Sequence, residues 1–140
     1  MKGYRWVVLG VIILASFVAY VLRTNVSIVG ESMMTDLGMT EYQLGLVFSA
    51  FAAGYAVFQF PGGLIGDRFG PRRTIAAIAI AWTVLTVATA LIPDSGTWPI
   101  AWTVGALMLA RFLIGAANGP FFPVTIGGTI ERWFPASQWG

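Results

Sequence analysis

The sequence predicts an all-α integral membrane protein. Hydrophobic residues make up 57% of the 140 residues and charged residues only 10%, a balance that ordinary soluble domains do not have. Apolar stretches recur along the chain, and each is close to the roughly 20 residues that cross the hydrocarbon core as a helix. The charged residues gather mainly between these stretches. The chain is therefore expected to cross a bilayer several times.

Four apolar stretches are long enough to be membrane-spanning helices. A stretch longer than about 20 residues can tilt or project beyond the hydrocarbon core. The first stretch exceeds the apolar part of a typical signal peptide and has no small-residue cleavage site before a soluble domain, so it counts as a span. The predicted helices are Trp6–Gly30, Glu41–Gly66, Arg72–Ile92 and Trp98–Thr129.

The segments at the two ends of these helices differ in charge. The first connection carries Glu31, Asp36 and Glu41 without a basic residue, and the third carries only Asp94. The basic residues near helix ends all lie on the opposite side of the membrane from these two connections: Lys2, Arg5, Arg68, Arg72, Arg73 and Arg132. The positive-inside rule then predicts a cytoplasmic N-terminus. We expect a multi-pass protein of the plasma (inner) membrane.

Several kinds of site are excluded by composition. The chain has no Cys and no His, so disulfides, thiolate chemistry, common zinc sites and His general bases are absent. No paired carboxylates lie in apolar surroundings, and we expect no enzymatic activity, metal or cofactor. Because the basic residues at membrane ends account for the net charge of +2, no nucleic-acid partner is indicated.

The remaining two basic residues, Arg23 and Arg111, lie inside predicted helices. An Arg at the centre of a membrane helix costs roughly 2.5–3.5 kcal/mol on the translocon scale, so each requires a reason. Helical spacing places Tyr20 on the face of Arg23 and Asn118 on the face of Arg111. A guanidinium binds a carboxylate or phosphate through two parallel bonds, which a Lys does not do. We expect Arg23 and Arg111 to bind an organic anion in a water-filled cavity, with added hydrogen bonds from Tyr20 and Asn118.

A structural role for each Arg is the alternative. Arg23 or Arg111 would then pair with an acid on another helix or extend to a membrane interface. None of the acids falls clearly at mid-membrane depth, since all lie at or near predicted helix ends: Glu31, Asp36, Glu41, Asp67, Asp94 and Glu131. The lack of a local counter-ion favours a bound anion.

The connection after the second helix, "GGLIGDRFGPRRTI", carries charges that oppose the helix dipoles. Asp67 ends one helix and Arg72 and Arg73 begin the next, so each sign is unfavourable for its own helix. Gly70 permits a tight turn, and Pro71 suits a first helical position. A partner for Asp67 elsewhere in the fold would resolve the mismatch.

This connection resembles the signature loop of the major facilitator superfamily, which lies between the second and third helices of that family. The matching residues are Gly63, Asp67, Arg68, Gly70, Arg72 and Arg73. In the fourth span, "RFLIGAANGPFFP" resembles the second motif of the family. The chain looks most like the anion:cation symporter branch, whose members carry organic anions such as sugar acids and other carboxylates. The resemblance covers essentially all 140 residues.

The resemblance implies a twelve-helix transporter, monomeric at full length, whose N-terminal six-helix half begins with residues 1–140. It implies that Asp67, Arg68 and Arg72 help to hold the cytoplasmic side closed during alternating access. Arg23 and Arg111 would line the central cavity, on helices that correspond in the inverted repeats. Gly119–Pro120 would loosen the fourth helix where it bends.

Two positions depart from proton-coupled members of this branch. Those members commonly have an acid just before the first Arg and a Glu seven residues after the second, where this chain has Leu22 and Asn118. Proton symport through this pair is therefore in doubt. The coupling partner is left open among H⁺ at another carboxylate, Na⁺ and an exchanged anion.

Other functions compete with organic-anion transport. The main alternative is a carrier of the same superfamily for a neutral sugar or a drug, in which Arg23 and Arg111 are structural or coupling residues. A small four-helix multidrug exporter is disfavoured, because that class uses an acid in its first helix. A non-transporting receptor on the same fold is the third possibility.

Overall fold

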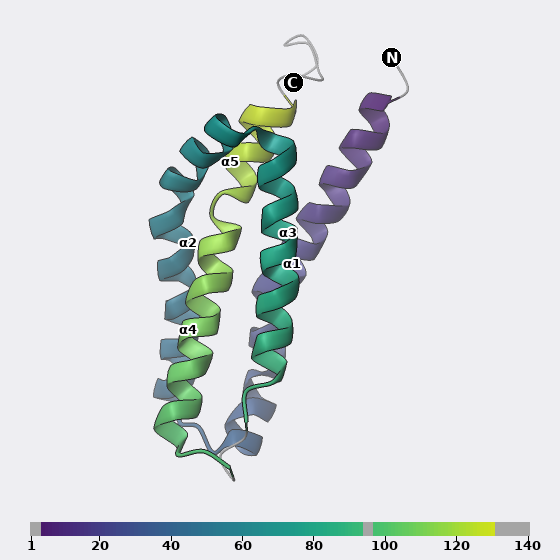
Figure 1. The fold of residues 1–140 in the computed structure, drawn as a ribbon. Coiled ribbons are helices and arrows are strands. Elements are labelled where there is room, and N and C mark those ends of the chain that lie inside the picture. The colour runs from purple at the N-terminus through teal and green to yellow at the C-terminus, as the bar shows by residue number, and fades with distance from the viewer. Residues whose placement is uncertain (1–3, 94–96, 131–140) are drawn as a thin grey trace.

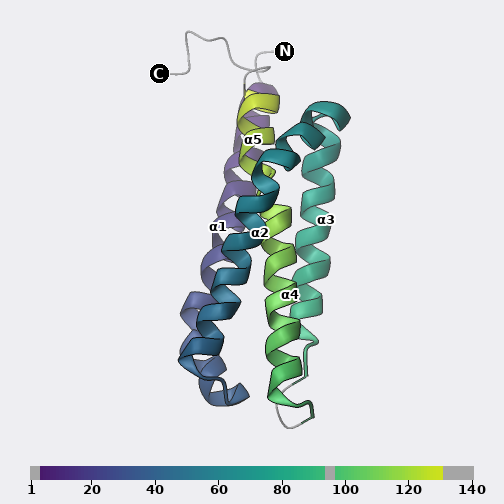
Figure 2. The same ribbon diagram turned by 90° about the vertical axis from the view of Figure 1, so that its left-hand side faces the viewer.

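The computed structural model describes residues 4–93 and 97–130, apart from the side chains of residues 25–27 and 130. This part of the chain is helical and contains no strand. Figures 1 and 2 show an elongated bundle whose long helices run between two opposite ends. The elements are α1 (Tyr4–Leu37), α2 (Glu41–Phe69), α3 (Pro71–Ala90), α4 (Ile100–Asn118), α5 (Phe121–Thr125) and the π-helix η1 (Ile126–Ile130).

The four predicted membrane spans are confirmed. The helices α1, α2 and α3 are each long and apolar enough to cross a bilayer, and so is the combined stretch Ile100–Thr129. The start of α1, the α2–α3 connection and η1 lie at one end of the bundle, and the other two connections lie at the opposite end (Figures 1 and 2). We call the first of these the basic end, because its described charges are Arg5, Asp67, Arg68, Arg72 and Arg73. Lys2, Asp94, Glu131 and Arg132 lie outside the described residues.

The first helix is longer than the sequence predicts. It continues past Gly30 through the polar segment "ESMMTDL" and ends only at Leu37, before Gly38 with its φ of +65°. Within this extra stretch the Thr35 hydroxyl donates a hydrogen bond to the Glu31 carbonyl at 3.1 Å. The segment contains no strong helix breaker, so loss of hydrophobicity alone does not end the helix.

Local signals at the helix ends account for the other boundaries. Thr40 and Gln43 form a capping box, with bonds of 3.3 Å from the Gln43 N–H to Thr40 Oγ1 and 2.9 Å from the Thr40 N–H to Gln43 Oε1. The connection to α3 turns at Gly70, whose φ of +82° favours glycine. The fourth span is interrupted after Asn118 at Gly119 and Pro120, where the proline ring has no N–H to continue the helix.

The closest packing in the bundle is between α2 and α4. A Cβ atom added at Gly54 would collide with the carbonyl of Phe112, and one at Gly115 would collide with the carbonyl of Phe51. One added at Gly119 would lie 2.8 Å from the Gln59 nitrogen. The two backbones therefore touch directly, as small residues allow in membrane helices.

The first helix joins the bundle through side chains instead. Ala19 packs with Ile78 and Trp82 of α3 and with Phe121 of α5 in one buried cluster. A second cluster forms near the opposite end of the bundle around Met39, Val47, Val104 and Leu107. These contacts bring the middle of α1 against α3, α4 and α5.

Candidate functional site

A pocket of about 340 Å³ lies between α1, α2 and the region where α4 passes into α5. It brings together three residues that the sequence singled out on two separate helices: Arg23, Tyr20 and Asn118. Tyr20 is at the midpoint of the long first helix. The remaining lining residues are Ser16, Phe17, Ala19, Phe51, Tyr55 and Phe122.

Arg23 faces the pocket with an aromatic ring as its neighbour. Its guanidinium carbon lies 5.7 Å from the ring centroid of Tyr55, within the range of a cation–π interaction. The Tyr55 ring is in turn stacked against Phe51 at a centroid distance of 6.4 Å. No carboxylate in the described part of the chain forms an ion pair with Arg23, whose side chain is exposed. Among the described residues, Arg23 thus has an aromatic neighbour and no acidic partner.

Asn118 contributes a buried hydrogen-bond donor to the same pocket. It is the last residue of α4 and only 4% exposed. Its Nδ2 atom is buried and has no hydrogen-bond partner among the described residues. A buried donor without a partner costs roughly 1–3 kcal/mol, and a ligand oxygen beside it would remove that cost.

Arg111 lies beside Leu22 of α1 and does not line this pocket. Its side chain is 9% exposed, and one terminal nitrogen donates to the Leu22 carbonyl at 3.4 Å. Its Nε is buried and has no hydrogen-bond partner in the described part of the chain. Arg111 therefore ties α4 to the backbone of α1 at the residue just before Arg23.

Tyr55 is a functional candidate that the sequence analysis did not assign to the site. It lies on α2 and not on the helices that carry Arg23 and Arg111, and its place opposite Arg23 depends on how α2 is turned against α4. The glycine contacts at Gly54 and Gly115 set that rotation. Gln59, one turn further along α2, instead lines a separate pocket with Gly63 and Asp67.

The residues of the predicted gating loop spread over several surfaces of the basic end. Gly63 and Asp67 line the pocket beside Gln59, and the Arg68 guanidinium lies 5.8 Å from the ring centroid of Phe69. Within the described chain, neither Asp67 nor the loop arginines form an ion pair. No ion pair within the described chain therefore holds this loop in place. Arg72 and Arg73 point to two grooves on either side of α3.

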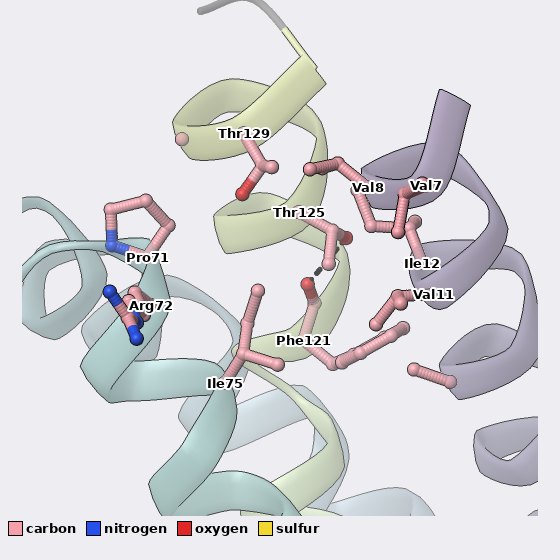
Figure 3. Close-up of a pocket in the computed structure, with 12 residues that line it drawn as sticks. Val7, Val8, Val11, Ile12, Pro71, Arg72, Ile75, Phe121, Thr125 and Thr129 are labelled. Carbon is pink, nitrogen blue, oxygen red and sulfur yellow. Dashed lines mark hydrogen bonds between the residues drawn. The ribbon is translucent and has the colours of Figure 1, made fainter. Parts of the chain in front are cut away.

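Figure 3 shows the groove on the α1 side of α3, which is separate from the Arg23 pocket. It is lined mostly by apolar side chains, including Val11, Ile75 and Phe121. The hydroxyl of Thr125 is occupied, because it donates to the Phe121 carbonyl at 2.7 Å, the dashed line in Figure 3. The described residues contain no group of side chains that suits a metal ion.

The fold and the site together define a polytopic membrane protein with an Arg in a pocket of mixed lining, where no described acid pairs with it. The model of the Major Facilitator Superfamily matches residues 12–140. The chain belongs to this superfamily.

Three curated relatives are similar to nearly the whole chain. A probable sulfoacetate transporter of Cupriavidus necator is 37% identical over 97% of the chain and 29% of the relative. A probable galactarate/D-glucarate transporter of Bacillus subtilis is 35% identical over the same shares. A hexuronate transporter of Bacillus subtilis is 34% identical over 89% of the chain and 27% of the relative. The chain thus spans less than a third of the length of these relatives. The search of solved structures found no match.

Proposed function

We propose that residues 1–140 are the start of the N-terminal half of a secondary active transporter that moves an organic anion across the plasma membrane by alternating access. The anion is a sugar acid or another carboxylate. The carrying observation is the pocket in which, among the described residues, Arg23 has an aromatic neighbour and no acid and the buried Nδ2 of Asn118 has no hydrogen-bond partner. The names of the relatives, which describe carriers of sulfoacetate, aldarates and hexuronates, support this class of substrate.

Each polar group of the pocket has a separate part in binding. The guanidinium of Arg23 receives the carboxylate through parallel N–H bonds while Tyr55 covers its other side. Asn118 Nδ2 and the Tyr20 hydroxyl donate to oxygens of the anion. Arg111 adds positive potential from beside Leu22, and its burial limits the screening of this charge by solvent.

The basic end is the cytoplasmic end in this proposal. The positive-inside rule applies to the arginines at that end, which places the N-terminus in the cytoplasm. Asp67, Arg68 and Arg72 act there as part of the gate, with Gly63, Gly70 and Arg73 shaping the loop. Their lack of ion pairs within the described chain supports partners in a further part of the transporter.

The transport cycle does not use Leu22 or Asn118 as proton carriers, because neither side chain titrates. Coupling therefore involves H⁺ at another carboxylate, Na⁺ or exchange for a second anion. Replacing the pH gradient by a sodium gradient, or by internal anion, distinguishes these cases in sealed vesicles.

A carrier for a neutral sugar or drug is the second candidate. The bond from Arg111 to the Leu22 carbonyl favours it, because that bond gives Arg111 a structural role without any anion. Arg23 argues against it, since a neutral solute leaves this charge unpaired.

The deciding experiment is uptake into proteoliposomes that contain the full-length protein. Labelled glucuronate and galactarate are compared with the corresponding neutral sugar alcohol, at equal concentrations. We expect saturable uptake of one or more anions and none of the alcohol. Uptake of the alcohol alone, or inhibition of its uptake by neutral sugars but not by acids, would establish the second candidate.

A further inference from the structure

A second groove lies on the other side of α3, between α3 and α2 near the basic end. It has a volume of about 480 Å³. Ile65 and Phe69 form its α2 wall, and Ala77 and Ala81 form its α3 wall, over a floor of Ala117 and Pro120. The hydroxyl of Thr74 is occupied by a 3.0 Å bond to the Gly70 carbonyl. The groove is therefore apolar along its length.

The groove exists because α2 packs closely against other helices. A Cβ atom at Gly62 would collide with Pro120, and one at Gly66 would collide with Val124. These contacts draw the end of α2 onto α5. The small side chains of Ala77 and Ala81 then leave a space between α2 and α3 that larger residues would fill.

One end of this groove is positively charged. Arg73 lines it and is exposed, and no acid of the described chain pairs with it. Asp67, the single acid described at this end, lines a different pocket with Gln59. Arg68 lies beside the groove, with its guanidinium over Phe69, a wall residue. An occupant that suits both parts has an apolar chain and an anionic group at one end.

We propose that this groove binds an acidic phospholipid of the leaflet at the basic end. One acyl chain lies between Phe69 and Ala77, and the phosphate group accepts hydrogen bonds from Arg73. Basic pockets between membrane helices are suited to anionic headgroups, and charge-assisted bonds to phosphate are stronger than neutral ones. The site differs from the pocket of Arg23, and the proposal does not depend on which substrate is transported.

The test is lipid binding to the detergent-purified full-length protein, measured by native mass spectrometry. Phosphatidylglycerol is compared with phosphatidylcholine of the same acyl chains. We expect phosphatidylglycerol to bind at least about fivefold more tightly, the effect of roughly one Lys or Arg near the headgroup. The Arg73→Gln variant loses this preference, and Arg73→Lys keeps most of it.

Arg72→Gln is the matched control, because it removes the same charge from the neighbouring residue, which lines the groove of Figure 3 instead. The control keeps the lipid preference. Ala77→Phe fills the groove and lowers the binding of both lipids, whereas soluble glycerol phosphate does not compete. Equal losses in Arg72→Gln and Arg73→Gln, or unchanged binding in Ala77→Phe, would overturn the proposal, because the lipid would then respond to diffuse charge alone.

Discussion

The α2–α4 interface and the contacts of α1 represent two different ways of joining membrane helices. Between α2 and α4, glycines such as Gly54 and Gly115 bring the backbones into direct contact. The first helix is held by the small side chain of Ala19 and by the long side chain of Arg111. Direct backbone contact fixes both distance and rotation, whereas side chains leave rotamers to adjust.

The position of the Arg23 pocket follows from this difference. Tyr55 and Asn118 belong to the tightly packed pair, and Arg23 and Tyr20 belong to α1. One wall of the pocket is therefore fixed, and the other depends on a few side-chain contacts. Changes in α2–α4 should alter folding, and changes between α1 and this pair should alter binding.

Gly115→Leu should have the largest effect. A side chain at this position would collide with the Phe51 carbonyl and force the two backbones apart. The loss should exceed the roughly 1–3 kcal/mol of ordinary overpacking, so little folded protein is expected by size-exclusion chromatography. Gly10→Ala on α1 is the control, since a Cβ there meets nothing within 4 Å. A normally folded Gly115→Leu protein would contradict the packing described.

Arg111→Met should raise the stability of the free protein and weaken its response to an anion. The buried guanidinium makes one 3.4 Å bond and leaves Nε unpaired, so the cost of its desolvation should exceed the value of that bond. We expect a higher melting temperature for the free variant and a smaller rise on adding an anion. A lower melting temperature with an unchanged anion response would show that Arg111 is only a structural tie.

Tyr55→Leu should weaken anion binding by an intermediate amount. The cation–π contact with Arg23 is worth about 0.5–2 kcal/mol. Because this contact already exists without the anion, its loss is divided between stability and affinity, and the Kd should rise by at most roughly 30-fold. Tyr55→Phe keeps the ring and should bind almost normally. Titration calorimetry distinguishes the two variants, and equal losses in both would assign the effect to the hydroxyl.

Thr40→Ala should have the smallest effect, confined to stability. It removes the capping box at the start of α2 and should cost about 1 kcal/mol. Chemical denaturation measures this loss, and the Kd for the anion should not change. A changed Kd would mean that the cap influences the pocket at a distance.

The sequence predicted the features that depend on composition and local signals. Apolar length gave the four spans. The fourth span was expected as one helix that bends at Gly119 and Pro120, and the structure interrupts it there. The continuation of α1 to Leu37 was missed, because the spans were predicted from hydrophobicity and this extension is polar.

The parts of the site that sequence reasoning could not predict depend on contacts between distant residues. Tyr55 meets Arg23 because Gly54 and Gly115 fix the rotation of α2. Arg111 bonds to the Leu22 carbonyl through a long side chain whose rotamer no periodic pattern encodes. Helical spacing identified Arg23, Tyr20 and Asn118 as candidates, and only the fold brings them to one pocket.

The most direct test of the anion site is the Kd of galactarate for the full-length protein, measured by calorimetry for the wild type, Arg23→Gln and Arg23→Lys. A charge-assisted bond is worth about 1.5–3 kcal/mol, so Arg23→Gln should bind at least about tenfold more weakly, with Arg23→Lys intermediate. If another sugar acid proves to be the transported substrate, the same comparison applies to it. Unchanged anion affinity in Arg23→Gln, or equal affinity of the wild type for the neutral sugar alcohol, would contradict the account.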